Sequence, residues 1–306
     1  MADLIATIEP RQRINLSEEA RVTIESDLLD YEGEKPKYNS AVNRIFLASY
    51  RSGLIKHDRE IAAKYASRKP SSFSKKVLYL QTAVTRILQL EIDFINTIYC
   101  GSPGKYIKSV IEQYADLPYL ERERIFFDEI VKQIETAILH KERITVESGT
   151  ALRSVRPYRI GTDRLSAYNY LVGYIKQSKS KDTIGVFRVS RIKSVINEGE
   201  AGGLTDFEIL ELKKAIEERD LPYIIYQPKK ILIRLNPTGL WMYSSLIQNR
   251  PIYYSKEDGL FTFYCSEAQA ENYFFKFGAN AEIIEPASLR DKFKDMYHDA
   301  SALYDK

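Results

Sequence analysis

Three short runs between Ser154 and Ile192 hold the side chains best suited to binding chemistry. They read SVRPYRI (154–160), AYNYLVGYI (167–175) and VFRVSRI (186–192), and each has the composition of a β-strand. Guanidinium groups donate paired hydrogen bonds to phosphate, and tyrosine rings stack on bases. No acid–base pair accompanies them, so the runs predict a site that holds an anion rather than one that transforms a substrate. The candidate residues are Ser154, Arg156, Tyr158, Arg159, Tyr170, Arg188 and Arg191.

The third run raises a geometric condition. Arg188 and Arg191 are three residues apart, so a regular strand would direct their side chains to opposite faces. They can share one anion site only if the strand bends, bulges or ends between them. Otherwise, one of the two belongs to an outer ion pair.

Catalytic and metal-binding patterns are missing from the sequence. The histidines, at positions 57, 140 and 298, have no nearby nucleophile or second metal ligand in the sequence. We find no glycine-rich phosphate loop before a helix and no HExxH, CxxC or GxSxG motif. We therefore expect a protein that is not an enzyme and that uses no cofactor and no metal.

The composition bounds the remaining possibilities. The chain has 306 residues, enough for two or three domains, and its net charge is only +3, so any basic surface must be local. Cys100 and Cys265 are far apart and predict free thiols in a reducing cytosol. The start has no signal-peptide pattern, and Glu91 and Asp93 interrupt the most apolar segment, 87–98, so we expect a cytoplasmic protein without a membrane span.

The first 50 residues predict one strand and two helices. Residues 11–16 alternate polar and apolar side chains, which is the strand period. Ser17 can cap a helix that runs to about Tyr31, and Asn39 or Ser40 can cap a second helix. About 45 residues cannot bury enough surface to fold alone. We therefore expect a homodimer in which the strands of two copies pair antiparallel.

This unit resembles the ribbon-helix-helix fold, whose two-stranded ribbon enters a DNA groove. The resemblance places Arg11, Arg13 and Asn15 toward nucleic acid, above Ile14 and Leu16. It implies phosphate contacts from the start of the second helix, and the loop 32–38 before that helix is longer than the family's usual turn. The alternative is a ribbon that serves dimerisation alone. The phosphate-contact residues would be Lys37, Asn39 and Ser40, with Lys35 beside them.

In the rest of the chain, the spacing of apolar residues changes twice between the helical and the strand period. Residues 57–139 have a helical pattern throughout, including one long helix over 74–99 and another over 120–139, which predict a scaffold with dimer contacts. A β region then runs from 144 to 197, a linker covers 198–203, and Thr205 caps a helix over 206–219. Residues 230–306 predict a compact α/β unit with strands at 230–235, 260–265 and 281–286. We find no internal repeat.

The β region resembles the WYL domain, a small Sm-like β fold. The resemblance rests on PYRI (157–160), NYLVGY (169–174) and FRVSRI (187–192), and the family's name triplet appears as Asn169-Tyr170-Leu171, without the tryptophan. In that family a basic and polar groove binds nucleic acid or a nucleotide-like ligand. The resemblance implies a groove that consists of Ser154, Arg156, Tyr170, Arg188 and Arg191.

The C-terminal unit resembles the extension that commonly follows WYL domains. The matching segments are KILIRL (230–235) and FFKFGANAEIIEPASLR (274–290), followed by a terminal helix. The extension implies dimer contacts and, in some members, contacts to a ligand or nucleic acid. Arg234 and Arg290 are the candidate polar contacts, and surface salt bridges explain them equally well.

Together these segments predict an α+β multidomain protein. The predicted parts are a ribbon-helix-helix domain (1–53), a helical connector (54–139), a WYL domain (140–200), a linker helix (201–229) and a C-terminal α/β extension for dimerisation (230–306). The arrangement is similar to accessory proteins of type VI-D CRISPR systems, which bind single-stranded RNA and raise the activity of an RNA-guided ribonuclease. This resemblance implies a homodimer that binds single-stranded RNA through the WYL groove.

Two alternatives stay open at this stage. The first is a ligand-responsive transcription regulator, in which the ribbon reads duplex DNA and the WYL domain senses an effector. The second is a structural dimer with a vestigial groove. The accessory-protein and transcription-regulator hypotheses differ in whether the ribbon is the principal surface that binds nucleic acid.

Overall fold

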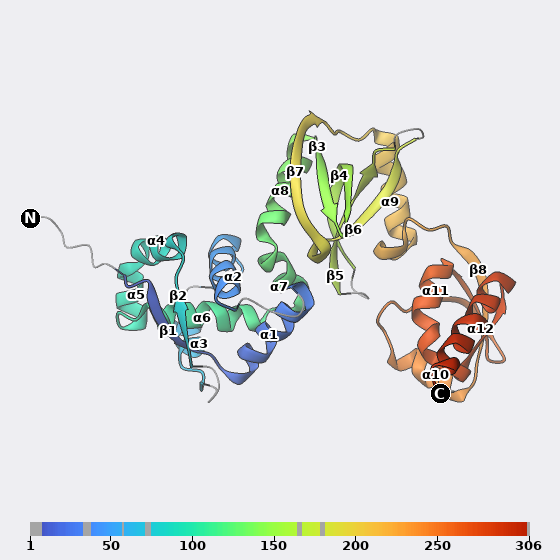
Figure 1. The fold of residues 1–306 in the computed structure, drawn as a ribbon, viewed down its shortest axis with the longest axis horizontal. Coiled ribbons are helices and arrows are strands. Elements are labelled where there is room, and N and C mark those ends of the chain that lie inside the picture. The colour runs from blue at the N-terminus through green and yellow to red at the C-terminus, as the bar shows by residue number, and fades with distance from the viewer. Residues whose placement is uncertain are drawn as a thin grey trace, which may run out of the picture. The chain divides into compact units, whose positions relative to one another are not determined.

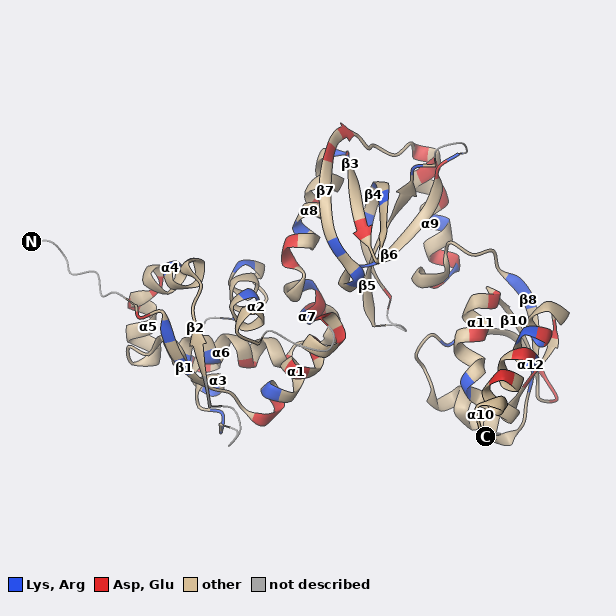
Figure 2. Ribbon diagram, in the orientation of Figure 1, with Lys and Arg blue, Asp and Glu red and all other residues tan. Residues whose placement is uncertain are grey.

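The computed structural model describes residues 8–32, 38–56, 58–70, 75–163, 167–177 and 181–304. It confirms the predicted α+β class: helices and three antiparallel sheets are distributed over two compact units, residues 1–132 and 133–306. Figure 1 gives the element order, and Figure 2 shows basic and acidic residues interspersed in both units. No helix in the described ranges is both long and apolar enough to span a membrane.

The first unit contains one two-stranded ribbon and a set of helices packed beneath it (Figure 1). The ribbon consists of β1 (Arg11–Asn15) and β2 (Lys75–Tyr79), which pair antiparallel within the same chain. Ile14 and Leu78 are buried under it. The helices are α1 (Glu18–Glu32), α2 (Tyr38–Ser52), α3 (Arg59–Ala66), α4 (Thr82–Leu90), α5 (Ile92–Tyr99), α6 (Pro103–Asp116), α7 (Tyr119–Phe126) and α8 (Asp128–His140), the last of which continues into the second unit.

Two sequence predictions for this unit are wrong. The expected helix over 74–99 is instead β2, α4 and α5, because Val77 and Tyr79 are exposed on either side of the buried Leu78, which is the strand period. The expected helix over 120–139 is divided into α7 and α8 at Phe127. The order strand–helix–helix therefore occurs twice, as β1–α1–α2 and β2–α4–α5, although no repeat is recognisable in the sequence.

A close backbone contact holds the ribbon on the helices. Gly104 lies in the first turn of α6, where a Cβ atom would come within 2.6 Å of the carbonyl oxygen of Arg13. Ser102 caps this helix by accepting a hydrogen bond from the Lys105 amide, and Pro103 occupies the first turn. Glycine at this position lets α6 pack directly against the backbone of β1.

The second unit begins with a curled five-stranded sheet in the order β6-β5-β4-β3-β7. The edge strands β6 and β7 are joined by only the three-residue 3₁₀ turn η1 (Val189–Arg191), so the sheet must curl until its edges approach each other, as in a small barrel. Ile144, Val146 and Val155 are buried inside it. The strands are β3 (Glu142–Ser148), β4 (Ala151–Asp163), β5 (Tyr168–Ile175), β6 (Thr183–Arg188) and β7 (Ile192–Ala201).

Helix α9 (Asp206–Glu218) and the 3₁₀ turn η2 (Leu221–Tyr223) cover the outer face of β5. The predicted cap is confirmed: the Thr205 hydroxyl accepts a hydrogen bond from the Glu208 amide, and the Glu208 carboxylate accepts one from the Thr205 amide, which forms a capping box. Leu212 and Ala215 of the helix pack on Tyr170, Val172 and Tyr174 of the sheet.

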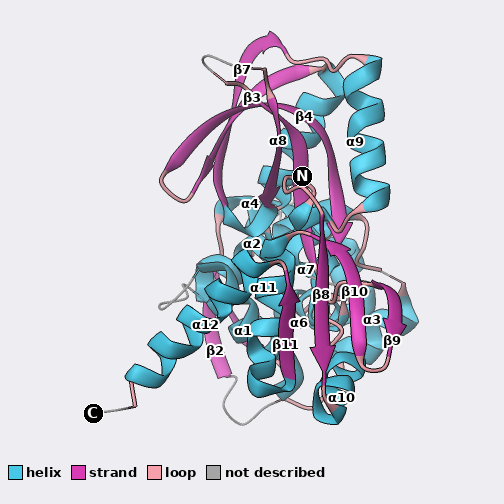
Figure 3. Cartoon of the chain, turned by 90° about the vertical axis from the view of Figure 1, so that its right-hand side faces the viewer, coloured by secondary structure: helices cyan, strands magenta, loops and turns pink. Residues whose placement is uncertain are grey.

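The C-terminal part of this unit is a four-stranded antiparallel sheet in the order β11-β8-β10-β9. Helices lie on one side of it (Figure 3), and buried aromatic side chains pack between them and the sheet. The sequence predicted β8, β10 and β11 but not β9, whose residues are all exposed. The elements are β8 (Lys229–Leu235), α10 (Pro237–Ser245), β9 (Tyr253–Glu257), β10 (Leu260–Cys265), α11 (Glu267–Phe274), the 3₁₀ segment η3 (Phe275–Asn280), β11 (Ala281–Glu285) and α12 (Ala287–Ala302).

Candidate nucleic-acid interface

The three sequence runs of the predicted cluster form neighbouring antiparallel strands, β4, β5 and β6. Across them, Gly161, Tyr170 and Arg188 lie directly opposite one another, so they share one face of the sheet. This is the face that α9 and η2 partly cover. The structure thus brings the predicted residues to one sheet, and it divides them into two groups along β4.

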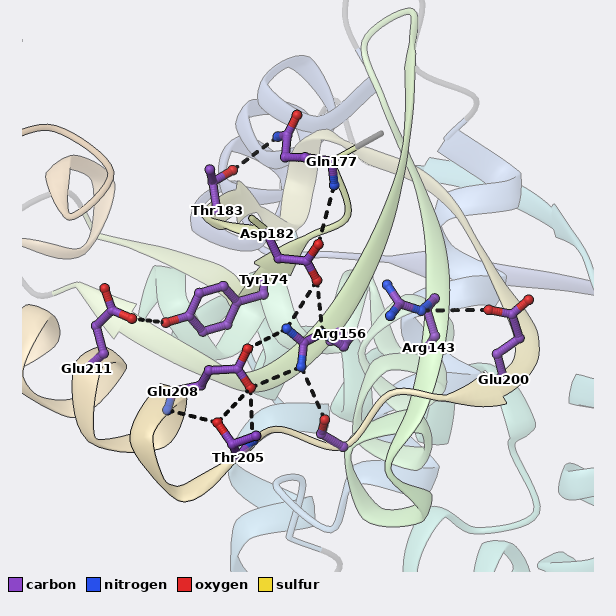
Figure 4. A network of polar contacts seen from close by, with 11 residues as sticks. Arg143, Arg156, Tyr174, Gln177, Asp182, Thr183, Glu200, Thr205, Glu208 and Glu211 are labelled. Atoms are coloured by element: carbon purple, nitrogen blue, oxygen red, sulfur yellow. Dashed lines mark hydrogen bonds and ion pairs between the residues drawn. The ribbon is translucent and has the colours of Figure 1, made fainter. Parts of the chain in front are cut away.

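The first group is centred on Arg156, whose guanidinium group is neutralised within the chain (Figure 4). Its Nη1 atom donates to Glu208 Oε2 at 3.0 Å and to the Gly203 carbonyl at 3.2 Å, and its Nε donates to Asp182 Oδ2 at 3.2 Å. Only 13 % of the Arg156 side chain is exposed. Arg156 therefore fastens α9 and the loop before it to the sheet.

The electrostatics of this network follow from its geometry. Hydrogen bonds from Arg156 lower the pKa of Glu208 from its usual 4.5 to about 2, and bonds from Thr205 add to the effect against the opposing cost of burial. The bond to Glu208 likewise raises the pKa of Arg156. Tyr174 donates its hydroxyl hydrogen to Glu211 on the same helix. These contacts stabilise the fold, and a phosphate could reach Arg156 only by displacing a carboxylate.

Ser154 belongs to the same end of the sheet. It lies opposite Thr145, which donates its hydroxyl hydrogen to Glu198 at 2.7 Å. The Ser154 hydroxyl is buried and has no hydrogen-bond partner among the described residues. A buried hydroxyl in this position is not accessible to a polymer in the conformation described.

The second group surrounds Gly161 and consists of arginines against tyrosine rings. The Arg188 guanidinium carbon lies 3.1 Å from the centre of the Tyr168 ring, and its Nε donates to Ser190 Oγ at 2.7 Å. The side chain of Arg159 is exposed, 5.9 Å from the Tyr158 ring centre. A Cβ atom on Gly161 would be 3.7 Å from Arg159 Nε, so Arg159 lies along the same row as Tyr170 and Arg188.

Tyrosines in this group differ in their access to solvent. Tyr170 is only 7 % exposed and packs in the apolar cluster with Leu212 and Leu221. Its ring lies against protein and is not open to a base, in contrast to the role expected from the sequence. Tyr158 and Tyr168 are half-buried. Sequence reasoning missed Tyr168, although it has the same strand parity as Tyr170 and Tyr174 and so belongs to the same face.

The condition set for Arg188 and Arg191 is met. Strand β6 ends at Arg188, and Arg191 is the last residue of the η1 turn, where it is exposed. Strand parity therefore no longer separates the two side chains. Arg156 has two acidic partners, Glu208 and Asp182. The three sequence runs could not reveal them, because Glu208 belongs to α9 and Asp182 is the residue before β6.

The ribbon of the first unit is complete within one chain. The sequence predicted that β1 would pair with β1 of a second copy; instead, β1 pairs with β2 of the same chain, so the two-stranded ribbon forms without a second copy. Arg11 and Arg13 are exposed and Asn15 is half-buried. They share their face with the exposed Tyr79 and Val77, which lie opposite Arg11 and Arg13.

Residues at the start of α2 have a different role from the one expected. Asn39 uses its side-chain amide to clamp the end of β2: its Oδ1 accepts from the Tyr79 amide at 2.9 Å and its Nδ2 donates to the Tyr79 carbonyl at 3.0 Å. One turn further along α2, Asn43 Oδ1 accepts a hydrogen bond from the Gln81 amide at 2.8 Å. Ser40 is exposed. Lys35 and Lys37 lie outside the described residues.

The other candidates are ordinary surface features. Arg234 Nη1 lies 3.0 Å from Glu282 Oε2, and Arg290 Nη2 lies 3.7 Å from Glu282 Oε1, with all three side chains about half exposed. Cys100 and Cys265 are both free, as predicted. Within the described ranges no three acidic, histidine or cysteine side chains are grouped so that they could hold a metal ion.

Comparisons with known proteins support the fold. No protein-family model and no curated protein matches the chain. A solved structure described as "Crystal structure of a CRISPR Cas-related protein" has a TM-score of 0.76 and 20 % identity over 96 % of this chain and 94 % of that chain. The structure of proteasome accessory factor B/C (PafBC) of Arthrobacter aurescens has a TM-score of 0.29 and 16 % identity over 98 % of this chain and 51 % of that chain, too low to support an argument. The chain therefore shares its fold, over nearly its whole length, with a CRISPR Cas-related protein.

Proposed function

We propose that this protein is a CRISPR accessory protein that binds single-stranded RNA through its five-stranded sheet and stimulates an RNA-guided ribonuclease. The observation that carries the proposal is the second group of the sheet, where Arg159 and Arg188 lie beside Tyr158 and Tyr168. Arginine against an aromatic ring presents both a donor fork for phosphate and a flat surface for a base. The shared fold with a CRISPR Cas-related protein supports the biological setting.

RNA fits this group better than duplex DNA does. The structure places Arg159 and Arg188 on the face of a small curled sheet and not on a helix or ribbon that could enter a major groove, whereas unstacked bases of a single strand can reach this face. Arg191, exposed on the η1 turn, is the residue best placed to extend the basic group beyond Arg188. Arg156 contributes to stability rather than to binding.

The test is an RNA-binding titration with a matched control. Arg159→Ala combined with Arg188→Ala should lower the affinity for a 20-nucleotide single-stranded RNA at least tenfold, because hydrogen bonds to charged groups contribute about 1.5–3 kcal/mol each. Arg153→Ala is the control. Arg153 is also an exposed arginine on β4, but it pairs with Val146, which is buried inside the curled sheet, so it belongs to the face opposite to that of Arg159. Equal affinities of the double variant and the control would exclude this surface as the RNA site.

Stimulation is tested separately from binding. The ribonuclease of the same CRISPR system, loaded with guide RNA, would be assayed for cleavage with and without the accessory protein. The double arginine variant should lose the stimulation in parallel with its RNA affinity. Full stimulation by a variant that no longer binds RNA would contradict the proposed mechanism.

One observation favours a second candidate, a transcription regulator that binds duplex DNA through the ribbon. The complete β1–β2 ribbon exposes Arg11, Arg13 and Tyr79 on one face, and ribbons of this width fit a DNA groove. Arg13→Ala should then abolish binding to duplex DNA while Arg188→Ala leaves it intact. A chain that binds only single-stranded RNA, with affinity unaffected by Arg13→Ala, would exclude this candidate.

We also propose that the protein is a homodimer, formed through surfaces other than the ribbon edge. The C-terminal extension is the part that we expect to supply the contact. Sedimentation equilibrium of the full chain measures the association directly, and a monomer at all concentrations would contradict it.

A further inference from the structure

The C-terminal sheet has one open face, and that face is built differently from the rest of the surface. Its chain order is β–α–β–β–α–β, and its strands lie in the order fourth, first, third, second. In Figure 3 the strands β11, β8 and β10 lie in front of the helices of the same part of the chain. Alternate residues of the two central strands, among them Ile231, Ile233, Phe261 and Phe263, point into the core.

The residues between them form the open face. Tyr264 lies opposite Lys230, Thr262 opposite Leu232, and Leu260 opposite Arg234. None of these six side chains is buried. An antiparallel sheet with helices on one side only, and with its two central strands open to solvent, is the arrangement that presents aromatic residues to unstacked bases in RNA-recognition domains.

Two tyrosines on this face are unusually open. Tyr264 is 57 % exposed and Tyr254, from the neighbouring edge strand β9, is 77 % exposed. Their ring centres are 5.3 Å apart with an interplanar angle of 86°, so at least one ring face of the pair is left open to solvent. Aromatic rings that stay this exposed bury little apolar surface, so they add little to stability, whereas they are good platforms for bases.

Cations flank the tyrosine pair. Lys230 is paired with Tyr264 across the strands and Arg234 lies further along β8 on the same face. Their acidic partners are on the edge strand β11: Lys230 Nζ is 3.9 Å from Glu285 Oε2, and Arg234 Nη1 is 3.0 Å from Glu282 Oε2. All four side chains are about half exposed, so these ion pairs are weak and a phosphate can compete for the cations.

We propose that this open face, with Tyr254 and Tyr264 as stacking platforms and Lys230 as the phosphate contact, is a second binding site for single-stranded RNA. The proposal rests on the proposed function only for the choice of ligand, because its residues are separate from Arg159 and Arg188. A sheet with two platforms accommodates about two bases. Binding one strand at two sites of a chain raises the overall affinity without changing either site.

The experiment uses the full chain and a 20-nucleotide single-stranded RNA that contains 4-thiouridine. After irradiation, the cross-linked peptides are identified by mass spectrometry, and affinities are measured by fluorescence anisotropy. We expect adducts on peptides that contain Tyr254 or Tyr264. Tyr254→Ala combined with Tyr264→Ala should lower the affinity at least tenfold, and the corresponding double Phe variant should retain it, because the ring alone supplies the stacking.

Two further variants make the test specific. Trp241→Ala is the matched control, since Trp241 is a 67 % exposed aromatic residue on α10, and its affinity should equal that of the wild type. Lys230→Glu should weaken binding without removing a ring. Adducts confined to residues 156–191, with wild-type affinity of the double Ala variant, would overturn the second site and leave the first intact. Adducts confined to the tyrosine peptides would support the second site and exclude the first.

A protein contact is the remaining outcome. If the double Ala variant changes the wild-type oligomeric state in sedimentation equilibrium while its RNA affinity is unchanged, the open face is an interface between copies. That result would overturn the proposed RNA site.

Discussion

The ion pair between Arg156 and Glu208 gives a prediction whose size follows from the structure. Glu208→Gln removes the charge but keeps the capping box, because glutamine can also accept from the Thr205 amide. Lowering the Glu208 pKa from 4.5 to about 2 corresponds to about 3 kcal/mol at about 1.4 kcal/mol per pKa unit. We expect a loss of about 2 kcal/mol, since the two side chains are still 13 % and 12 % exposed and water therefore screens the pair in part.

Hydrogen exchange measures this loss locally. At pH 7 the amides of α9 should exchange roughly 30-fold faster in Glu208→Gln than in the wild type, which is the factor for about 2 kcal/mol. Glu217→Gln on the same helix is the control, because Glu217 is exposed. Exchange of α9 at the wild-type rate in Glu208→Gln would refute the conclusion that Arg156 holds the helix on the sheet.

The pH dependence of stability supplies an independent check. Because the pKa of Glu208 is lower in the folded than in the unfolded chain, the pair stabilises the fold above about pH 4.5, and the stabilisation is lost as the pH falls toward 2. In urea unfolding followed by circular dichroism, the difference between wild type and Glu208→Gln should therefore shrink across this interval. A difference that is constant with pH would mean that the charge of Glu208 is not its source.

Three further predictions concern other contacts. Gly104→Ala should lower the free energy of unfolding by about 2 kcal/mol, measured by urea unfolding, because the new Cβ would clash with the Arg13 carbonyl. Gly203→Ala is the control and should leave it unchanged, because the nearest atoms to its Cβ would be 3.8 Å away. Asn39→Ala should weaken the end of β2 by about 1–2 kcal/mol, read as faster exchange of the Tyr79 amide. Arg188→Ala should reduce the slope of log affinity against log salt by about 0.7 on single-stranded RNA, and an unchanged slope would exclude a phosphate contact.

Much of the fold follows from local sequence patterns. Alternation in 11–15, the β-rich runs of β4 to β6 and the Thr205 cap all have short-range signals that agree with the structure. Strand β2 was missed because Val77, Leu80 and Val84 fit a helical stripe as well as a strand, and its pairing with β1 is a contact between distant segments. Strand β9 has no buried face, so no period marks it.

The site was harder to predict than the fold. Residue types alone identified Arg156, Arg159 and Arg188, but the sequence could not show that two carboxylates neutralise Arg156. Asp182 and Glu208 approach Arg156 from 26 and 52 residues away in the chain. Such pairs depend on tertiary packing, and a single sequence contains no record of them. The clamp that Asn39 makes on Tyr79 was hidden for the same reason.

A bulge in β4 decides which arginines share a face. Pro157 pairs with Gly173 and Arg159 with Val172, so Tyr158 is an extra residue between consecutive pairs. Without it, Arg156 and Arg159 would have opposite parity and point to opposite faces. The bulge therefore places both on the α9 side of the sheet, where the carboxylates of Asp182 and Glu208 neutralise Arg156, while Arg159 is exposed. Of these two arginines, Arg159 is the one open to solvent. A nucleic acid should therefore approach this sheet from the Arg159 end, where Arg188 and Tyr168 also lie.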